Sequence, residues 1–523
     1  MDLDRLEALK RAFGTKEYAA LPRLLRQLGR ARFPDAASLI RFHEALLFFR
    51  AYPPNAEVVG LADELLQEIP KKLAQLRRAG VDLVPLEEPN VSGIAGTAFS
   101  ALFTYDMTRW LSEHHPDAVE IDWDGYDASL LGPLLRRLHP FANEDLLVEA
   151  NIPYMDWFRA AKPEGGSDLR WLISRIESLP IPAEDRAELF AQAKIAIRWE
   201  LVDSGVTRTN GRFPGRRKVF YHDAPLIRRA DVSLAAELES PALAIQKLSR
   251  ADGEKMLDFA RETSAMRYRE LHGFTYGDPA HVLRVDFGRG VEVFVSGVPR
   301  EHRLPLRAYH AGMFFKNGVP IGYIECLTLF DHMEVGFNLY YTFREGETAW
   351  LYARLLRLFH QLLAVTCFSV DPYQLGAHNE EAIESGAFWF YRKLGFRPAN
   401  PQVVQFLQRE ESKLRANPAY RTPARTLRRL AIGSMLYEIP GSRAGDWDRF
   451  ETRRAAMALH ASPFTPAIQR AKSAPEESTY VRALQQDPAL RRRILKLGSP
   501  SSEARSQNSE SRMSRVGTSL VHF

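Results

Sequence analysis

The sequence predicts a mixed α/β protein in which helices precede and follow a central sheet. In residues 1–205 apolar side chains recur at helical spacing, as Leu3 and Leu6 do. Between Val282 and Tyr341 the pattern changes to the alternation that is typical of strands. At the end of the chain Ser, Arg, Glu, Asn and Gln dominate, which is a composition typical of disorder. We therefore expect a large all-α domain, a core with a mixed sheet flanked by helices, C-terminal helices and a disordered tail.

Length and composition set limits on function. The chain has 523 residues, enough for about three domains of roughly 150 residues each. A hydrophobic content of 45% and a charged content of 26% are typical of a soluble globular protein. The net charge of +5 is small for this length, so the sequence does not favour a nucleic-acid partner. The charged N-terminus and the lack of a long apolar run predict a cytoplasmic protein with no membrane partner.

The first half shows no fixed repeat period, so a regular helical repeat is not supported. Thr207–Lys218 is basic and rich in turn residues, which marks a boundary. We read it as a solvated loop, with contact to an anionic partner as the alternative. Two further helices are expected at about 230–248 and 252–271. The expected segments are a helical domain (1–205), a basic linker with a connecting helix (206–250), the core (251–400), C-terminal helices (401–497) and the disordered tail (498–523).

The core begins with strands joined by tight turns. A Gly288-Arg289-Gly290 turn divides the first strand pattern. Asn317-Gly318 lies between apolar runs and is a strong hairpin signal. A further strand is expected at 334–343.

A helix (347–364), a short buried strand (Cys367–Val370) and a second helix (380–394) should follow. Asn379 is a suitable N-cap for the second helix, and Gly395 a suitable C-terminal stop. Tyr391 comes late in this helix and should share a face with Ile383 and Ala387.

This order, with a late tyrosine before Gly395-Phe396, resembles the GCN5-related N-acetyltransferases (the GNAT superfamily) over about residues 250–400. The resemblance implies a GNAT-like core that binds an acyl-coenzyme A, in the first instance acetyl-CoA. It also implies direct transfer of the acyl group to an amine, which is a small molecule or a peptide, without a metal. The acceptor itself is not legible in the sequence.

In this family a loop between a strand and a long helix binds the coenzyme's pyrophosphate through backbone N–H groups. The matching stretch runs from Arg344 to Ala349, with its glycine one position earlier than in the family pattern. The alternative is an ordinary helix N-terminus with acidic residues in its first turn. The residues that the resemblance assigns to cofactor binding are Leu339, Tyr340, Tyr341, Arg344, Gly346, Glu347, Thr348, Ala349 and Asn379.

The resemblance also supplies candidates for proton transfer. Glu334 matches the family's base, and Glu325 on the preceding strand is the second candidate. Tyr391 matches the tyrosine that protonates the departing thiolate. For each carboxylate the alternative is a solvent-facing strand residue, and for Tyr391 it is an aromatic residue of the core.

Two other functional classes remain open. One is a catalytically inactive GNAT-like binding or regulatory protein with a helical interaction domain. An open loop at Gly346 with Glu345 and Glu347 turned outward would favour the enzyme, and a filled groove would favour this alternative. The other is an aminoacyl-transfer variant, which usually needs two such cores where this sequence shows one.

Residues elsewhere have simpler interpretations. His114-His115 followed by Asp117 is read as a polar helix end rather than a metal site. Cys326 and Cys367 are too few for a disulfide framework, and we read them as buried packing residues.

Overall fold

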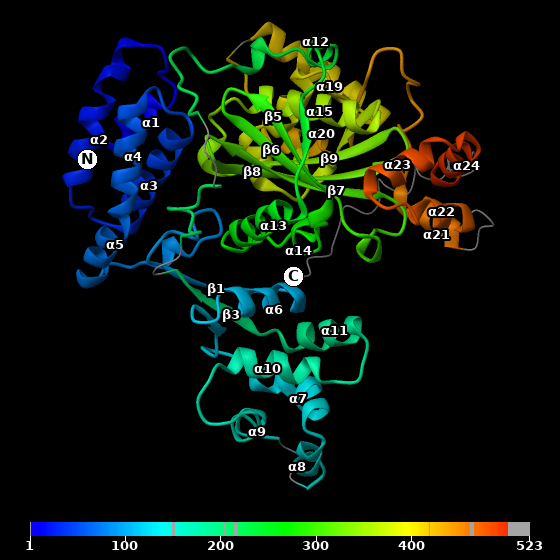
Figure 1. Ribbon diagram of the computed structural model, residues 1–523. Coiled ribbons are helices and arrows are strands. Elements are labelled where there is room, and N and C mark those ends of the chain that lie inside the picture. The colour runs from blue at the N-terminus through cyan, green and yellow to red at the C-terminus, as the bar shows by residue number, and fades with distance from the viewer. Residues whose placement is uncertain are drawn as a thin grey trace.

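The computed structural model describes residues 2–148, 152–201, 205–213, 218–417, 419–460 and 465–499. The protein has a nine-stranded sheet, a three-stranded sheet and helices around both (Figure 1), so the predicted mixed α/β class is confirmed. Most of the predicted disordered tail lies outside the described residues; Gly498, where the tail was expected to begin, ends the last helix.

The N-terminal helices pack against the large sheet and share its hydrophobic core. The central helix of this group is covered nearly all round, since twelve of its sixteen residues are buried. It begins where the Asp35 side chain accepts a hydrogen bond from the Ser38 N–H, 2.8 Å away. The helices are α1 (Leu3–Leu9), α2 (Leu21–Arg30), α3 (Ala36–Ala51), α4 (Ala56–Gln67) and α5 (Ile69–Arg78).

Residues 98–201 form a second unit with a core of its own, below the large sheet in Figure 1. Its elements are β1 (Ala98–Leu102), α6 (Tyr105–His114), β2 (Val119–Ile121), α7 (Gly132–Leu138), α8 (Asn143–Val148), α9 (Tyr154–Ala161), α10 (Asp168–Glu177), α11 (Ala183–Ala193) and β3 (Ala196–Glu200). The three strands pair antiparallel in the order β1-β3-β2. The prediction of an all-α domain over 1–205 is therefore wrong here. Strands this short show no clear alternation, and β1 is completed by a partner almost a hundred residues later in the chain.

The large sheet has the order β11-β12-β10-β9-β8-β7-β6-β5-β4. All its neighbouring pairs are antiparallel except β9 and β10, which run parallel. Its strands are β4 (Ile245–Lys247), β5 (Val282–Gly288), β6 (Val291–Ser296), β7 (Ala308–Lys316), β8 (Val319–Leu329), β9 (His332–Leu339), β10 (Cys367–Val370), β11 (Arg397–Pro398) and β12 (Met435–Glu438).

Both predicted turns are confirmed. Asn317 and Gly318 have φ angles of 50° and 81° and join β7 to β8 in a tight hairpin. Gly288, Arg289 and Gly290 also have positive φ and connect β5 to β6 through a bulge. Glycine suits these positions because left-handed backbone carries no Cβ penalty for it.

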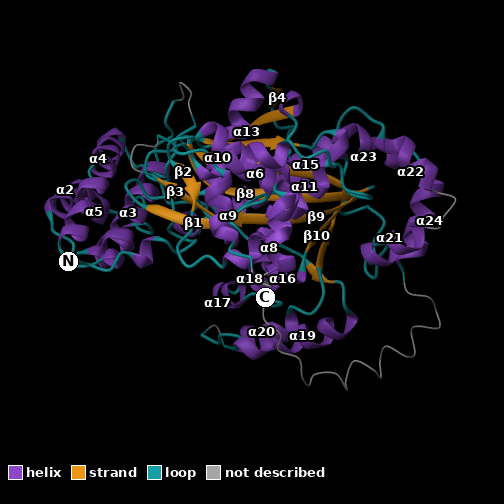
Figure 2. Cartoon of the chain, turned by 90° about the horizontal axis from the view of Figure 1, so that it is seen from below, coloured by secondary structure: helices purple, strands orange, loops and turns teal. Residues whose placement is uncertain are grey.

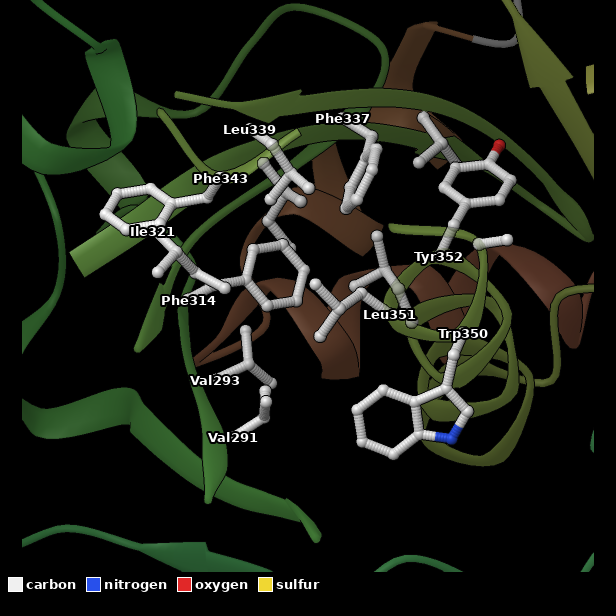
Figure 3. Close-up of a cluster of buried hydrophobic side chains, with 14 of the residues drawn as sticks. Val291, Val293, Phe314, Ile321, Phe337, Leu339, Phe343, Trp350, Leu351 and Tyr352 are labelled. Atoms are coloured by element: carbon white, nitrogen blue, oxygen red, sulfur yellow. The ribbon is translucent and has the colours of Figure 1, made fainter. Parts of the chain in front are cut away.

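Helices cover both faces of the large sheet. In the close-up of Figure 3, Leu351 and Tyr352 of one helix meet Phe314 and Phe337 of the strands. A second helix buries the opposite face, where Met313 and Phe315 point. The helices are α12 (Leu234–Leu238), α13 (Arg250–Ala265), α14 (His272–Thr275), α15 (Thr348–Leu363), α16 (Pro372–Leu375), α17 (Glu380–Ser385), α18 (Ala387–Lys393), α19 (Pro401–Ala416), α20 (Ala424–Leu430), α21 (Thr452–His460), α22 (Thr465–Lys472), α23 (Glu477–Gln485) and α24 (Pro488–Gly498). The helix drawn in Figure 3 is α15, and the helix on the other face of the sheet is α13.

Three predicted elements need correction. The helix expected over 380–394 is divided into α17 and α18, because Gly386 adopts a left-handed φ of 67°. The helix expected at 230–248 shrinks to α12, and β4 follows it at the sheet edge. The C-terminal region is not purely helical, since β12 inserts between β10 and β11. That pairing is decided by distant partners, which local periodicity does not report.

The C-terminal helices α21–α24 gather at the end of the sheet opposite α1–α5 in both views (Figure 1 and Figure 2).

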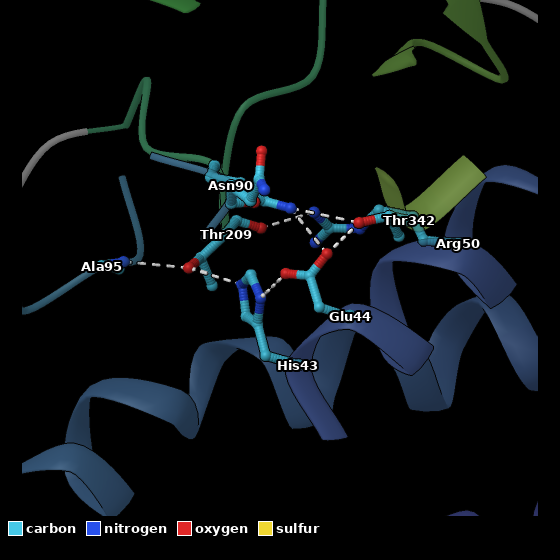
Figure 4. A network of polar contacts seen from close by, with 8 residues as sticks. His43, Glu44, Arg50, Asn90, Ala95, Thr209 and Thr342 are labelled. Carbon is cyan, nitrogen blue, oxygen red and sulfur yellow. Dashed lines mark hydrogen bonds and ion pairs between the residues drawn. The ribbon is translucent and has the colours of Figure 1, made fainter. Parts of the chain in front are cut away.

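Part of the predicted basic linker is buried rather than solvated. Arg208 is 5% exposed and forms an ion pair with Glu44 of α3 at 2.6 Å. The same carboxylate accepts a hydrogen bond from the hydroxyl of Thr342, in the segment between β9 and α15. His43 contacts Glu44 and Thr209, each at 3.0 Å (Figure 4). This network therefore joins α3, the linker and the end of β9.

We predict that Arg208→Met destabilises the protein by about 3–5 kcal/mol, because Glu44 would be left buried without a counterion. The matched control is Arg26→Met, which breaks a half-exposed pair with Glu57 and should cost under about 1 kcal/mol. Urea unfolding measures both variants. Equal small losses would contradict a structural role for the buried pair, and adding Glu44→Gln to Arg208→Met should recover part of the stability.

Candidate functional site

The parallel strands β9 and β10 separate soon after they begin to pair. Hydrogen-bonded register extends only from His332 to Glu334 on β9. β10 ends at Val370, whereas β9 continues to Leu339 and there is paired only with β8, on its other side. The later residues of β9 therefore present backbone groups that have no strand partner on this side.

The side-chain amide of Gln374, in α16, fills this gap. Its Nε2 donates to the carbonyl of Val335 at 3.1 Å, and its Oε1 accepts from the N–H of Phe337 at 3.3 Å. The hydroxyl of Tyr391 donates to the same Oε1 at 3.3 Å. One primary amide thus completes the edge of β9 and contacts the predicted acid.

Tyr391 is 5% exposed and packs among aromatic rings, including those of Tyr352 and Phe396. Burial raises the pKa of its phenol well above the ordinary value. Tyr391 is therefore an aromatic residue of the core, as one interpretation of the sequence expected. Its hydroxyl nevertheless contacts Gln374 beside β9.

The two predicted carboxylates lie on one face of the sheet, the face covered by α13. Glu334 pairs with Arg307 at 3.2 Å, and burial raises its pKa. Glu325 accepts a hydrogen bond from the hydroxyl of Tyr309.

Glu325 lies on β8, beside the part of β9 that borders the gap. It is directly opposite Gly336 in the register of β8 and β9. A Cβ added at Gly336 would lie 3.6 Å from both the Glu325 Cβ and the Gln374 Nε2. A side chain at position 336 would therefore meet both Glu325 and Gln374.

The predicted phosphate loop is closed. A Cβ at Gly346 would lie 2.5 Å from the hydroxyl of Tyr52, the residue directly after α3, so this tyrosine covers the glycine. Glu347 is 1% exposed and turned inward, where it pairs with Arg289 at 2.5 Å. Glu345 pairs with Arg11 outside. The structure does not support the predicted role of Gly346 and Glu347 in holding phosphate, because the N-terminal helices occupy that place.

Lys316 lies behind Glu347, with 3.7 Å between its Nζ and the carboxylate. The ammonium is fully buried and lies over the rings of Tyr52 and Phe220. Burial lowers its pKa to about 7, against a partial opposing effect of Glu347.

Three other predicted cofactor residues have structural roles. The Asn379 side chain accepts from the Ala382 N–H at 3.1 Å and so caps α17. The Thr348 hydroxyl donates to the carbonyl of Arg344 at 3.1 Å. Ala349 is a buried residue in the first turn of α15.

The remaining predicted cofactor residues come together at a cleft beyond the end of β9. Leu339, Tyr340, Tyr341 and Arg344 form one part of its lining. Sequence analysis missed the other part, in which Arg208, Arg267 and Arg269 are the cationic members. An Arg-x-Arg pair directly after a helix is a weak signal that would have pointed to Arg267 and Arg269. We call this feature the arginine cleft, defined by Arg208, Arg267, Arg269, Tyr340, Arg344 and Glu381.

Within the described ranges, no group of three or more His, Cys, Asp or Glu residues has the geometry of a metal site. His115 instead contacts Glu262 at 3.0 Å, and His114 stacks on Trp110. Cys326 and Cys367 are buried, as expected. Among the helices that the structure describes, none is both long and apolar enough to cross a bilayer.

Comparison with known proteins adds no assignment: no protein family, curated protein or solved structure matches the chain.

We predict that the buried ammonium makes stability depend on pH. The pKa of Lys316 is about 7 in the folded protein and about 10.4 in an unfolded chain. Between these two pKa values the unfolded chain binds more protons at Lys316 than the folded protein does. The free energy of unfolding should therefore increase with rising pH, by up to about 1.4 kcal/mol per pH unit. Lys316→Met should lose this increase relative to wild type. Urea unfolding from about pH 7 to about pH 9 measures it, and parallel curves for the two proteins would contradict it.

Proposed function

We propose that this chain is an acyl-coenzyme A-dependent N-acyltransferase with a GNAT-like core. The observation that carries the proposal is the unpaired edge of β9, where Val335 and Phe337 present a carbonyl and an N–H to the amide of Gln374. The amides of the pantetheine arm of coenzyme A are trans, so each points its N–H and its carbonyl in opposite directions. The N–H of one amide and the carbonyl of the next would therefore form this pair of hydrogen bonds once Gln374 moves aside.

The order of elements supports the proposal. A helix, antiparallel strands with a tight hairpin, a last strand, a long helix and a parallel strand follow one another as α13, β5–β9, α15 and β10. This is the order on which the resemblance to the acetyltransferases depends. Fold alone does not define function, so the argument rests on the groups beside the gap.

The side chains at the gap fit the proton transfers. In this proposal Glu325, whose carboxylate accepts a hydrogen bond from Tyr309, takes the proton of the amine. Tyr391, whose hydroxyl contacts Gln374, donates a proton to the departing thiolate. The proposed donor is acetyl-CoA, and the proposed acceptor is an amine.

The donor's phosphates need a different place from the predicted loop, since Tyr52 covers Gly346. Arg344 is the first residue of that loop and lies outside the part that Tyr52 covers, with 40% of its side chain exposed. It pairs with Glu381 at 2.6 Å across the mouth of the cleft. We assign the phosphate groups of the donor to the part of the cleft that Arg344 lines.

A second candidate is a catalytically inactive binding or regulatory protein. The buried cluster of Glu347, Arg289 and Lys316 favours it, because it fills the site that the family uses for phosphate. The experiments below separate the two candidates.

Coenzyme A should produce a saturable thermal shift with wild-type protein. Gln374→Ala removes the internal amide that competes for β9, so coenzyme A should bind about tenfold more tightly to this variant. Gln408→Ala, an exposed glutamine of α19, is the matched control and should leave the affinity unchanged. No shift with either wild type or Gln374→Ala at millimolar ligand would favour the inactive candidate.

Tyr391→Phe should lower turnover by about 10²–10⁴-fold, the usual effect of losing a positioned proton donor. The phenyl ring keeps its packing, so coenzyme A affinity should stay nearly constant. Steady-state kinetics with labelled acetyl-CoA, after an acceptor screen, measures the effect. Wild-type turnover of this variant would refute the role of Tyr391 as the acid.

A further inference from the structure

The arginine cleft carries more positive charge than the protein neutralises. Arg208 is paired with Glu44, and Arg344 is paired with Glu381. For Arg267 and Arg269 no carboxylate lies within ion-pair distance in the part of the chain that the structure describes. Two guanidinium groups of the cleft are therefore left without a carboxylate in direct contact.

Arg267 is unusual because it is also buried, with 6% of its surface exposed. One nitrogen donates to the carbonyl of Thr263 at 2.7 Å, but its Nε has no hydrogen-bond partner. The guanidinium lies 4.2 Å from the ring centre of Tyr340, whose buried hydroxyl also lacks a partner. Burial lowers the pKa of Arg267 to about 10, so it stays charged at neutral pH. A buried charge and a buried hydroxyl without partners are costly, and an anion in the cleft would satisfy both.

The residue between the two arginines, Tyr268, has a strained backbone conformation. Tyr268 has a left-handed φ of 51° at the end of α13, where glycine is the usual residue. A non-glycine residue in this region costs about 1–2 kcal/mol. The Tyr268 ring packs on Phe99 of the second unit, at 5.1 Å between ring centres. This contact holds the sharp turn that lets both Arg267 and Arg269 line the cleft.

We propose that Arg267 and Arg269 bind a phosphate monoester group carried by the acceptor amine, with the Tyr340 hydroxyl as a third donor. This inference rests on the proposed acyltransferase function. The two arginines line the same cleft as Arg344, which is assigned to the donor. The cleft also includes Asn338, next to Phe337 at the gap, so an acceptor anchored here reaches the transfer point.

Charge complementarity selects phosphate over carboxylate. A phosphate monoester carries between about −1.5 and −2 near neutral pH, which matches two guanidinium groups. A carboxylate would neutralise one of them. Two guanidinium forks and a hydroxyl also supply enough donors for several phosphate oxygens.

Titration calorimetry with inorganic phosphate tests the site without any turnover. Wild-type protein should bind phosphate saturably, and acetate at equal ionic strength at least about tenfold more weakly. Arg269→Gln, at an exposed position, should weaken phosphate binding about tenfold, as expected from the loss of one charge-assisted hydrogen bond. Arg267→Lys keeps the charge but loses the planar fork and should weaken it similarly. Arg443→Gln, an exposed arginine of the loop after β12, is the matched control and should have no effect.

Repeating the titration with saturating coenzyme A assigns the site to one substrate. Unchanged phosphate affinity supports the acceptor site, whereas competition would give the arginines to the donor and overturn the inference. Absence of saturable phosphate binding, equal binding of acetate, or an equal loss in Arg443→Gln would also overturn it. If coenzyme A does not bind while Arg269→Gln still weakens phosphate binding, the phosphate site stands and the acyltransferase function fails.

Discussion

The free edge of β9 is the constraint on which the proposed site depends. A parallel partner pairs with only the first residues of the strand, and buried backbone groups without partners are costly. Gln374 meets this requirement with a single side-chain amide, and the same amide links α16 to Tyr391 of α18. Any ligand that enters the gap must replace these bonds with its own, which favours a ligand that offers both an N–H and a carbonyl to this edge.

The N-terminal helices are part of the frame of this site. Tyr52, directly after α3, covers Gly346, and Glu44 of α3 joins Arg208 and Thr342. The segment from the end of β9 to the start of α15 is therefore held from outside the sheet. Helices that the sequence analysis assigned to a separate helical domain therefore cover the start of α15.

Several parts of the fold followed from local sequence. Asn317-Gly318 specifies its hairpin because both residues tolerate left-handed backbone, and the apolar run Cys367–Val370 is a buried strand in the expected place. Long-range pairing was not legible. β1 with β3, and β12 between β10 and β11, are short strands whose stability comes from distant partners. Gly386 was read as part of one helix, although its φ of 67° divides it.

For the site, the sequence by itself determined the chemical inventory: a late tyrosine on a helix after a buried strand, carboxylates on neighbouring strands and a glycine before a long helix. Only the tertiary structure decided which of these groups meet. Tyr391 contacts Gln374 at the gap, Glu325 lies opposite Gly336, and Gly346 is covered. Gln374 and Arg267 emerged only from the fold, because their importance lies in which backbone or charge remains without a partner. That property depends on every element packed around them, and a linear pattern does not contain it.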